Sequence, residues 1–378
     1  MKNCDLDFKL DEVLPKFSVS LQRKIIHSVE LIRKAEPLAL AYDPNDGFFN
    51  TFSGGKDSQC LYHIVKMAGV KHKTHMNLTS VDPPEVIRFV KTEYPDVVLA
   101  KPKDSIFHIA IKKNILPTMR VRWCCAEYKE MAGAGKVTLI GIRHSESTRR
   151  AKRNEVELSN HAYSGDLNGL DEYRKQRNKG NKARSFSIIN VNGESQVGCI
   201  HGKESLLISP IIDWTEDDVW TFLNTLGIKH CCLYDEGFTR IGCILCPMSR
   251  RSQKEIDMKR WPHVKRNWIN AIKEIRRGGV FADGYIWWNI PISLIPLPRA
   301  GWRFRTGNQQ DRCLQRGSFH SRCSSQADSS SGGGIKKSPS PRFLIPREWL
   351  LHNEDWISTK ATIGSKASDF LIASRLTA

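Results

Sequence analysis

Apolar positions in the N-terminal part of the chain follow two alternating patterns. Short apolar runs that suit buried strands are separated by segments in which apolar residues recur every three or four positions, as on one face of a helix. Strands are expected at 47–51, 75–78, 97–100, 136–142 and 205–212, and helices at 17–36, 61–68, 83–94, 104–113 and from about 215. This alternation predicts an α/β fold with a mostly parallel, doubly wound sheet and helices on both faces.

The segment Phe52-Ser-Gly-Gly-Lys-Asp-Ser58 joins the first expected strand to the helix that follows it. A helix N-terminus presents unpaired N–H groups and a partial positive charge, and both attract phosphate. The segment supplies two residues without a Cβ, two hydroxyl donors and a cation, which are Gly54, Gly55, Ser53, Ser58 and Lys56. In parallel sheets ligands bind at the carboxyl ends of strands, where this turn is expected. The sequence therefore predicts a phosphate cradle, and the alternative is a glycine turn that binds nothing.

The composition points to anionic partners and away from membranes. The 378 residues carry a formal net charge of +18 with a pI near 9.5, which favours nucleotides, sulfated nucleotides or nucleic acid as ligands. No apolar run is long enough to cross a bilayer, and the first residues lack the apolar stretch of an export signal. Eleven cysteines in such a chain favour metal or redox chemistry over disulfides. The expected location is therefore the reducing cytoplasm.

A polar and basic segment extends from about 143 to 187, with most of its cations between 149 and 184. It has two interpretations: a solvated insertion, or a basic rim that steers a nucleotide or a nucleic acid. Beyond it, Thr215 is expected to cap a helix whose first turn holds the acids Glu216, Asp217 and Asp218. These acids suit the helix dipole, and we assign them to architecture rather than chemistry.

The chain divides by composition into four parts. Residues 1–44 form an expected helical lead-in, 45–250 the α/β domain with its basic insertion, and 251–289 a C-terminal helical segment. Residues 290–378 are broken by proline, rich in serine and glycine and poor in helical periodicity, so burial would not offset the entropy of ordering them. We expect disorder there, and a shifted reading frame in the gene is the other explanation.

Four cysteines form two closely spaced pairs, Cys124-Cys125 and Cys243-x-x-Cys246. The two-residue gap lets both sulfur atoms of the second pair reach one metal centre, and an adjacent pair is unusual in ordinary core packing. Four thiolates suit an iron–sulfur cluster or a zinc ion, and spacing alone does not choose between them. Buried structural cysteines are the third interpretation.

Several motifs in a fixed order give the chain a family resemblance. They are Arg122-Trp-Cys-Cys125, Gly141-Ile-Arg-His-Ser-Glu-Ser-Thr-Arg149, Ser209-Pro-Ile-Ile-Asp-Trp214 and Leu233-Tyr-Asp-Glu-Gly-Phe-Thr-Arg-Ile-Gly-Cys243. Together with the 52–58 turn they resemble the phosphoadenosine phosphosulfate (PAPS) reductase family over about residues 45 to 250. That family belongs to the PP-loop ATP-pyrophosphatase superfamily (adenine nucleotide α-hydrolase-like), in which this turn, the PP-loop, binds pyrophosphate. The resemblance implies a HUP-like α/β fold.

The resemblance also implies roles for single residues. The phosphates of ATP or of a sulfonucleotide would be held by Ser53, Gly54, Gly55, Lys56, Asp57 and Ser58, with Mg²⁺ if the substrate is ATP. Gly141 and Arg143 would lie beside the nucleotide, Arg143 as a bidentate phosphate partner. Lys56 and Arg143 are thus the candidate catalytic residues. Asp82 would contact ribose or metal, or form an ordinary turn, and Arg240 would make a second phosphate contact or pair with an acid.

The metal site follows from the same resemblance. By analogy with the adenylylsulfate-reductase branch, a [4Fe-4S] cluster would be ligated by Cys124, Cys125, Cys243 and Cys246. Zinc is the alternative metal. Cys199, Cys231 and Cys232 are close enough in sequence to serve as substitute ligands.

The family pattern breaks at one point. Sulfonucleotide reductases carry a nucleophilic cysteine in a Glu-Cys-Gly-Leu/Ile-His segment, which this sequence does not contain. The Gly-Gly-Lys-Asp form of the turn is more usual in members that cleave ATP between its α and β phosphates. The expected function is therefore sulfonucleotide reduction or ATP-dependent sulfur transfer, with a thiol or electron-donor protein as a further partner. The alternative is a nucleic-acid-associated binding protein that keeps the fold without catalysis and uses the basic residues 149–184.

Overall fold

The computed structural model describes residues 2–180, 188–200 and 202–277 of the chain. The described residues all belong to one unit of the chain, Met1–Gly284, and the remainder, Tyr285–Ala378, lies wholly outside them. The expected low-complexity tail, 290–378, and the end of the expected C-terminal helical segment, 278–289, therefore fall outside them too. Among the described helices, none combines the length and apolar character that spanning a bilayer requires.

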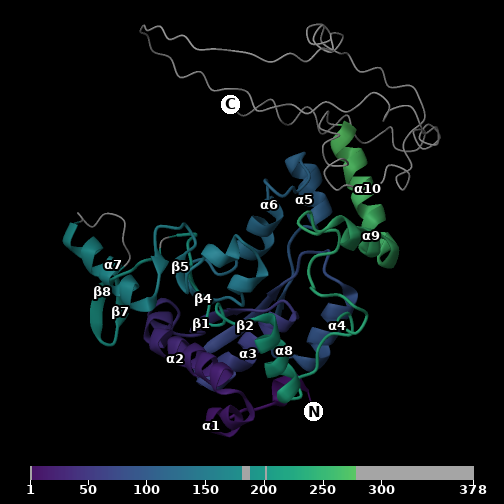
Figure 1. The fold of residues 1–378 in the computed structure, drawn as a ribbon. Coiled ribbons are helices and arrows are strands. Elements are labelled where there is room, and N and C mark those ends of the chain that lie inside the picture. Colours follow the sequence, from purple (N-terminus) through teal and green to yellow (C-terminus); the bar gives the residue numbers. More distant parts are fainter. Residues whose placement is uncertain (1, 181–187, 201, 278–378) are drawn as a thin grey trace, which may run out of the picture. The chain divides into compact units, whose positions relative to one another are not determined.

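A seven-stranded sheet organises the first unit, in the order β3-β2-β1-β4-β9-β5-β6 (Figure 1). The five strands from β3 to β9 run parallel, and β5 and β6 complete one edge in antiparallel orientation. The strands are β1 (Phe48–Thr51), β2 (His72–Asn77), β3 (Val98–Ala100), β4 (Val137–Leu139), β5 (Val156–Leu158), β6 (Ser164–Gly165) and β9 (Leu206–Ile208); β7 (Ile188–Val191) and β8 (Glu194–Val197) form a separate hairpin. The expected α/β fold with a mostly parallel sheet is confirmed.

Three helices form the main core together with the sheet: α2 (Val19–Tyr42), α3 (Lys56–Ala68) and α8 (Glu216–Thr225). Phe48 of β1 and Leu139 of β4 are buried in one apolar cluster with Leu61 of α3 and Phe222 of α8. Phe17, just before α2, stacks on Phe222 with ring centroids 5.7 Å apart. The turn that leads into α3 is therefore attached to a rigidly packed layer.

The ends of two core helices are fixed by hydroxyl caps. Ser18 accepts a hydrogen bond from the Leu21 N–H at 3.4 Å before α2, and Thr215 accepts from the Asp218 N–H at 3.1 Å before α8, as expected. The remaining helices are α1 (Leu10–Val13), α4 (Pro84–Glu93), α5 (Ile106–Lys113), α6 (Trp123–Cys125), α7 (Leu167–Gly180), α9 (Arg251–Arg260) and α10 (Pro262–Arg277). Short 3₁₀ or π turns lie at Asn3–Asp5, Leu14–Lys16, Ala126–Glu130, His144–Glu146 and Arg150–Lys152.

The strands beside the candidate site differ in length from the expected ones. The strands expected at 136–142 and 205–212 are only Val137–Leu139 and Leu206–Ile208. After β9 the chain turns, because the Ile212 N–H bonds back to the Ser209 carbonyl at 3.2 Å. The residues after Leu139 and after Ile208 therefore form loops at the carboxyl ends of these strands.

The basic segment at 143–187 is not simply a solvated insertion. Val156 and Leu158 of β5 are fully buried, and β5 pairs antiparallel with β9. The apolar positions that form this strand are few and stand among charged residues, so the alternation is too short to reveal it in the sequence. Residues 181–187 of the segment lie outside the described residues.

Candidate functional site

The 52–58 turn lies where the order of the parallel strands reverses. β2 and β3 lie on one side of β1, and β4 and β9 lie on the other. In open parallel sheets, such a switch point leaves a crevice at the carboxyl ends of the strands, and ligands bind there. The turn follows β1 directly, and Gly141 comes two residues after the end of β4. Both segments therefore meet at the place where the topology puts a ligand.

Two glycines shape this turn for the close approach of a ligand. Gly54 has a φ of +72°, and a Cβ built on it would lie 2.7 Å from Val86 Cγ1, so only glycine fits without strain. Gly55 is the N-cap residue of α3 and provides no side-chain cap. The first N–H groups of α3 must therefore find their partners elsewhere, as in an anion-binding helix N-terminus.

The two serines fix the form of the turn. The buried Ser58 hydroxyl donates to the Gly55 carbonyl at 2.8 Å and accepts from the Ser53 N–H at 3.2 Å. The Ser53 hydroxyl lies 3.2 Å from Ser58 Oγ, and Ser53 itself is exposed. Ser58 thus orders the cradle from inside, while Ser53 remains accessible to a ligand.

Lys56 is buried, with 4% of its surface exposed, and points toward α8 and the segment at 234–239. Its backbone N–H donates to the Tyr234 hydroxyl at 2.9 Å, and its Nζ donates to the Thr239 carbonyl at 3.0 Å. Nζ also pairs with Glu216 Oε1 at 3.3 Å and lies 5.6 Å and 6.0 Å from the ring centroids of Tyr234 and Trp220. Glu216, which we assigned to helix architecture, therefore also contacts the candidate catalytic lysine.

Arg143 connects the loop after β4 to the first turn of α3. It is 2% exposed, and its Nε donates to Asp57 Oδ1 at 2.6 Å while Nη1 donates to the Ser145 hydroxyl at 2.7 Å. A Cβ at Gly141 would lie 3.1 Å from the Asp57 carbonyl oxygen, so the two loops already touch. In this arrangement the Arg143 guanidinium is anchored by protein groups on two of its nitrogens, beside the cradle.

Arg150 interacts electrostatically with Asp57 and with a further arginine, Arg240. Burial lowers the pKa of the Arg150 guanidinium, the positive charge of Arg240 lowers it further, and the charges of Glu146 and Asp57 oppose the shift. Arg150 forms an ion pair with Glu146, whereas Arg240 is exposed and forms no ion pair within the described part of the chain. Neighbouring like charges favour an anionic ligand between them. Arg150 was hidden in the sequence by the surrounding run of cations.

Asp82 forms a turn in this structure. Its carboxylate accepts from the Thr79 N–H at 2.5 Å and from the Thr79 hydroxyl at 3.0 Å. Both bonds close the loop that follows β2, which is the ordinary role of aspartate in a turn. The Thr79 hydroxyl also lies 3.5 Å from Cys243 Sγ, so this loop connects the nucleotide side of the crevice with the cysteines.

The four candidate metal ligands approach one another from two segments. Cys124 and Cys125 lie in α6, and Cys243 and Cys246 follow the 234–239 segment. A hydrogen bond with the Cys125 thiolate, together with burial and the charges of the other three cysteines, raises the pKa of Cys124. The reciprocal bond from Cys124, with a 3.2 Å bond from Arg122 Nη2, lowers the pKa of Cys125 to about 5.

The donor chemistry of this group fits a thiolate-bound metal centre. The negative charge of Cys243 raises the pKa of Lys129, and a hydrogen bond between the two side chains adds to the shift. Two cations, Arg122 and Lys129, therefore flank the thiols. Such cations would offset the negative charge of four thiolates. Across the described ranges, no three His, Cys, Asp or Glu side chains surround one point as metal ligands would.

Of the possible substitute ligands, Cys199 and Cys231 are buried and Cys232 is exposed. The Cys199 N–H donates to the Tyr42 hydroxyl of α2 at 2.6 Å, and Cys199 belongs to the main core. Burial raises the pKa of Cys231 to about 11, with the neighbouring Cys232 adding to the shift.

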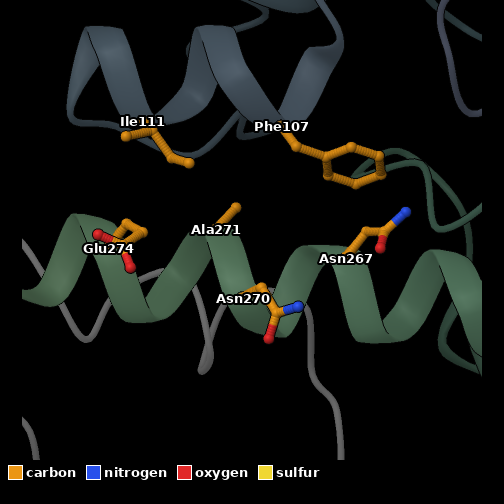
Figure 2. Close-up of a pocket in the computed structure, with 6 residues that line it drawn as sticks. All are labelled: Phe107, Ile111, Asn267, Asn270, Ala271 and Glu274. Atoms are coloured by element: carbon orange, nitrogen blue, oxygen red, sulfur yellow. The ribbon is translucent and has the colours of Figure 1, made fainter. Parts of the chain in front are cut away.

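Two pockets flank different parts of the unit. One of about 290 Å³ adjoins Lys56 and is lined by Glu216, Trp220, His230, Tyr234, Asp235, Gly237, Phe238 and Thr239. The other, of about 320 Å³, lies between α5 and α10, where Phe107 and Ile111 face Ala271 (Figure 2). The first shares Glu216, Tyr234 and Thr239 with the surroundings of Lys56, and the second shares no residue with the 52–58 turn.

Many cations of the basic segment are paired within the protein. Arg153 pairs with Glu157 of β5, Lys175 with Glu172 at 2.9 Å, and Arg174 with Asp171 at 3.3 Å. Arg150 pairs with Glu146, as described above. These contacts reduce the charge that the segment offers to a nucleic acid.

Comparison with known proteins identifies the domain. Residues 47–249, more than half of the chain, match the family model of the phosphoadenosine phosphosulfate reductase domain. The chain is 23% identical to an uncharacterized protein of Methanocaldococcus jannaschii over 70% of its own length and 56% of that protein. A second protein of that organism is 21% identical over 62% of the chain and 43% of its own length. The chain thus spans about half the length of these relatives.

Shorter or looser matches were also found. An adenosine 5'-phosphosulfate reductase of Oceanobacillus iheyensis is 33% identical over 15% of the chain and 24% of its own length. Among solved structures, PAPS reductase of Candida auris is 16% identical over 60% of the chain and 96% of its own, with a TM-score of 0.32. The U34-tRNA thiolase of Methanococcus maripaludis, with its [4Fe-4S] cluster, is 14% identical over 71% of the chain and 82% of its own, with a TM-score of 0.34. At these TM-scores the structural likeness carries no argument, and the assignment stands on the match in sequence.

Proposed function

Because the chain belongs to the phosphoadenosine phosphosulfate reductase domain family, we propose that it is an adenine-nucleotide-dependent enzyme of sulfur chemistry. The observation that carries the proposal is the position of the 52–58 turn, the PP-loop, at the switch point of the sheet with the N-terminus of α3 behind it. A helix N-terminus at such a point suits a nucleotide's phosphates.

The proposed phosphate site combines the PP-loop with cations from three other places in the sequence. Loop amides and Lys56 would bind the phosphates on one side, and the guanidinium groups of Arg143, Arg150 and Arg240 would face them on the other. Once they surround the bound phosphates, these groups would stabilise the negative charge that develops on a departing pyrophosphate or sulfite. Asp57 would orient Arg143 through its 2.6 Å bond rather than touch the substrate.

Of the two reactions compatible with the family, we favour ATP-dependent sulfur transfer. The Gly-Gly-Lys-Asp form of the PP-loop suits cleavage of ATP between the α and β phosphates, in which an acceptor oxygen attacks the α phosphorus and pyrophosphate leaves. Mg²⁺ would accompany ATP and neutralise part of the phosphate charge. Reduction of a sulfonucleotide is the second candidate, because the domain family takes its name from that reaction.

We propose that Cys124, Cys125, Cys243 and Cys246 ligate a [4Fe-4S] cluster. Their convergence from two segments and the flanking cations Arg122 and Lys129 support this assignment. When bound, the cluster would supply an iron–sulfur centre able to hold or activate the sulfur being transferred. Zinc would use the same thiols, and the optical spectrum separates the two metals, because a [4Fe-4S] cluster is brown and zinc is colourless.

The proposal is tested by incubating anaerobically purified protein with ATP, adenylylsulfate or its 3'-phosphorylated form, and measuring pyrophosphate, AMP and sulfite. Pyrophosphate and AMP from ATP in the presence of an acceptor support sulfur transfer, and sulfite from a sulfonucleotide supports reduction. Salt-sensitive binding of nucleic acid with none of these products would contradict both and favour a binding protein without turnover.

A further inference from the structure

The Tyr234 side chain occupies one of the hydrogen-bond donors of the PP-loop. Its hydroxyl accepts from the Lys56 N–H at 2.9 Å, a contact between residues 178 positions apart in the sequence. Lys56 is the first residue of α3, so this N–H has no acceptor within the helix. In a cradle built from helix N-terminal amides, it is one of the donors that a phosphate oxygen would use.

The hydroxyl and a phosphate oxygen need the same place. A hydrogen bond to this N–H requires an acceptor about 2.7–3.2 Å from the nitrogen, along one direction. The Tyr234 oxygen already lies there, and it is only 3.4 Å from the position of a Cβ at Gly55. A phosphate that engages the Lys56 N–H must therefore displace the hydroxyl.

The charged end of Lys56 is held in the same way. Its Nζ donates to the Thr239 carbonyl at 3.0 Å and pairs with Glu216 at 3.3 Å, so a main-chain oxygen and a carboxylate occupy donors that a phosphate would need. The Tyr234 ring lies 5.6 Å below Nζ. One short segment, 234–239, therefore contacts Lys56 at both its backbone and its side chain.

The surroundings give the Tyr234 ring room to withdraw. Tyr234 is one wall of the pocket of about 290 Å³ beside Lys56, and its neighbours Trp220, His230 and Phe238 are only partly buried. The ring meets Trp220 edge to face with centroids 5.0 Å apart, a contact that a small rotation breaks at low cost.

We propose that Tyr234 and Glu216 are positioning residues that hold Lys56 against the 234–239 segment and compete with nucleotide phosphates for its two donor groups. The inference rests on the proposed function, because it names which groups must release Lys56 before the PP-loop binds phosphate completely. Removing either competitor should therefore strengthen phosphate binding, whereas a purely structural role would weaken it or leave it unchanged.

The test measures pyrophosphate binding by titration calorimetry for the wild type and for two variants with matched controls. Tyr234→Phe removes the competing hydroxyl, and Tyr62→Phe removes a tyrosine hydroxyl that donates instead to Asp96 at 2.6 Å. Glu216→Gln removes the competing carboxylate, and Asp217→Asn removes the same charge one residue further along α8, away from Lys56. Thermal unfolding of each variant reports whether it folds.

We expect Tyr234→Phe to bind pyrophosphate about two- to tenfold more tightly, the range that loss of one competing hydrogen bond produces. Glu216→Gln should bind pyrophosphate at least about twofold more tightly than Asp217→Asn does. This second comparison still tests the inference if Tyr234→Phe does not fold. Unchanged or weaker binding in the folded variants, with a wild type that binds, overturns the inference alone. A wild type that binds neither pyrophosphate nor nucleotide overturns the proposed function together with it.

Discussion

The Arg143 guanidinium donates to the Asp57 carboxylate across 2.6 Å and thereby fixes the loop after β4 to the first turn of α3. The two residues follow β1 and β4, the two strands that flank the switch point of the sheet, and they are 86 positions apart in the sequence. Arg143 is 2% exposed, so it depends on this partner and on Ser145 to compensate for its lost hydration. The pair therefore supports both the fold and the proposed phosphate site.

Replacing Asp57 with asparagine should destabilise the protein, because a buried guanidinium loses its ionic partner. We expect the free energy of unfolding to fall by about 1.5–3 kcal/mol, as for other hydrogen bonds to charged groups. Denaturant titration measures the change. Asp46→Asn is the matched control, since Asp46 pairs with Lys73 at 3.3 Å on the exposed surface and should cost under about 1 kcal/mol. Equal losses in the two variants would contradict the importance assigned to the Arg143 pair.

Gly54→Ala should weaken nucleotide binding by more than backbone strain alone explains. Gly54 and Gly69 both have positive φ, at +72° and +68°, but only at Gly54 would a new Cβ clash, with Val86 at 2.7 Å. Gly69→Ala therefore reports the strain of the backbone, about 1 kcal/mol, without the clash. We expect ATP affinity to fall at least tenfold for Gly54→Ala and to be unchanged for Gly69→Ala, measured by titration calorimetry. Similar affinities for both variants would show that the close approach at Gly54 is unnecessary.

Serine in place of Cys124, Cys125, Cys243 or Cys246 should lower iron content and remove the brown colour of anaerobically purified protein. Each variant leaves three thiolates, and the hydroxyl of serine is a poor ligand for iron in a cluster. Cys232→Ser is the matched control, because Cys232 neighbours the segment but is exposed and lies outside the group of four. Iron and acid-labile sulfide analysis, with the visible spectrum, gives the result. If the wild-type protein is colourless and contains zinc, the four cysteines ligate zinc instead of an iron–sulfur cluster.

Acid should destabilise the protein through His63, which is buried in α3. Burial lowers the pKa of His63 from 6.5 to about 3, and its Nδ1 has no hydrogen-bond partner among the described residues. Between about pH 3 and 6.5, His63 is therefore protonated in the unfolded chain and neutral in the folded one. The stability due to neutral His63 is complete above pH 6.5 and is lost progressively as the pH falls toward 3.

His63→Gln should therefore flatten the pH dependence of unfolding below pH 6.5. The slope should decrease by up to about 1.4 kcal/mol per pH unit, the limit for one proton. Urea titrations between pH 7 and 4 measure it, with His108→Gln as the control because His108 lies exposed on α5. An unchanged slope in His63→Gln would assign the acid sensitivity to other groups.

The sequence predicts the fold well where each element has its own pattern. The apolar run before Ser53 and the helical spacing after it are enough to place β1, the PP-loop and α3, because strand, glycine turn and helix each leave a local signature. The family resemblance, carried by the motifs around Cys124, Gly141 and Tyr234, is confirmed by the domain match over residues 47–249. These signals depend on neighbouring residues or on the order of motifs along the chain, so they can be recognised without knowing how the chain packs.

Contacts between distant segments are what the sequence does not predict. Nothing in the Thr215 cap indicates that Glu216 pairs with Lys56, because the same acid also suits a helix N-terminus. Tyr234 stands inside a recognised motif, but only the fold shows that its hydroxyl meets the Lys56 N–H. Strand β5 is equally hidden, since its antiparallel partner β9 lies further along the chain, beyond α7 and the β7–β8 hairpin.

The central claim is that the PP-loop binds a nucleotide's phosphates, and its most direct test is the affinity for ATP and for adenylylsulfate of the Lys56→Met, Ser58→Ala double variant. Lys56 provides the charge and Ser58 holds the loop through its 2.8 Å bond to Gly55, so both the attraction and the shape of the cradle are removed. Calorimetric titration should show wild-type binding and a loss of at least a hundredfold in the variant, with the folded state verified by circular dichroism. Wild-type affinity in a folded double variant would contradict the claim.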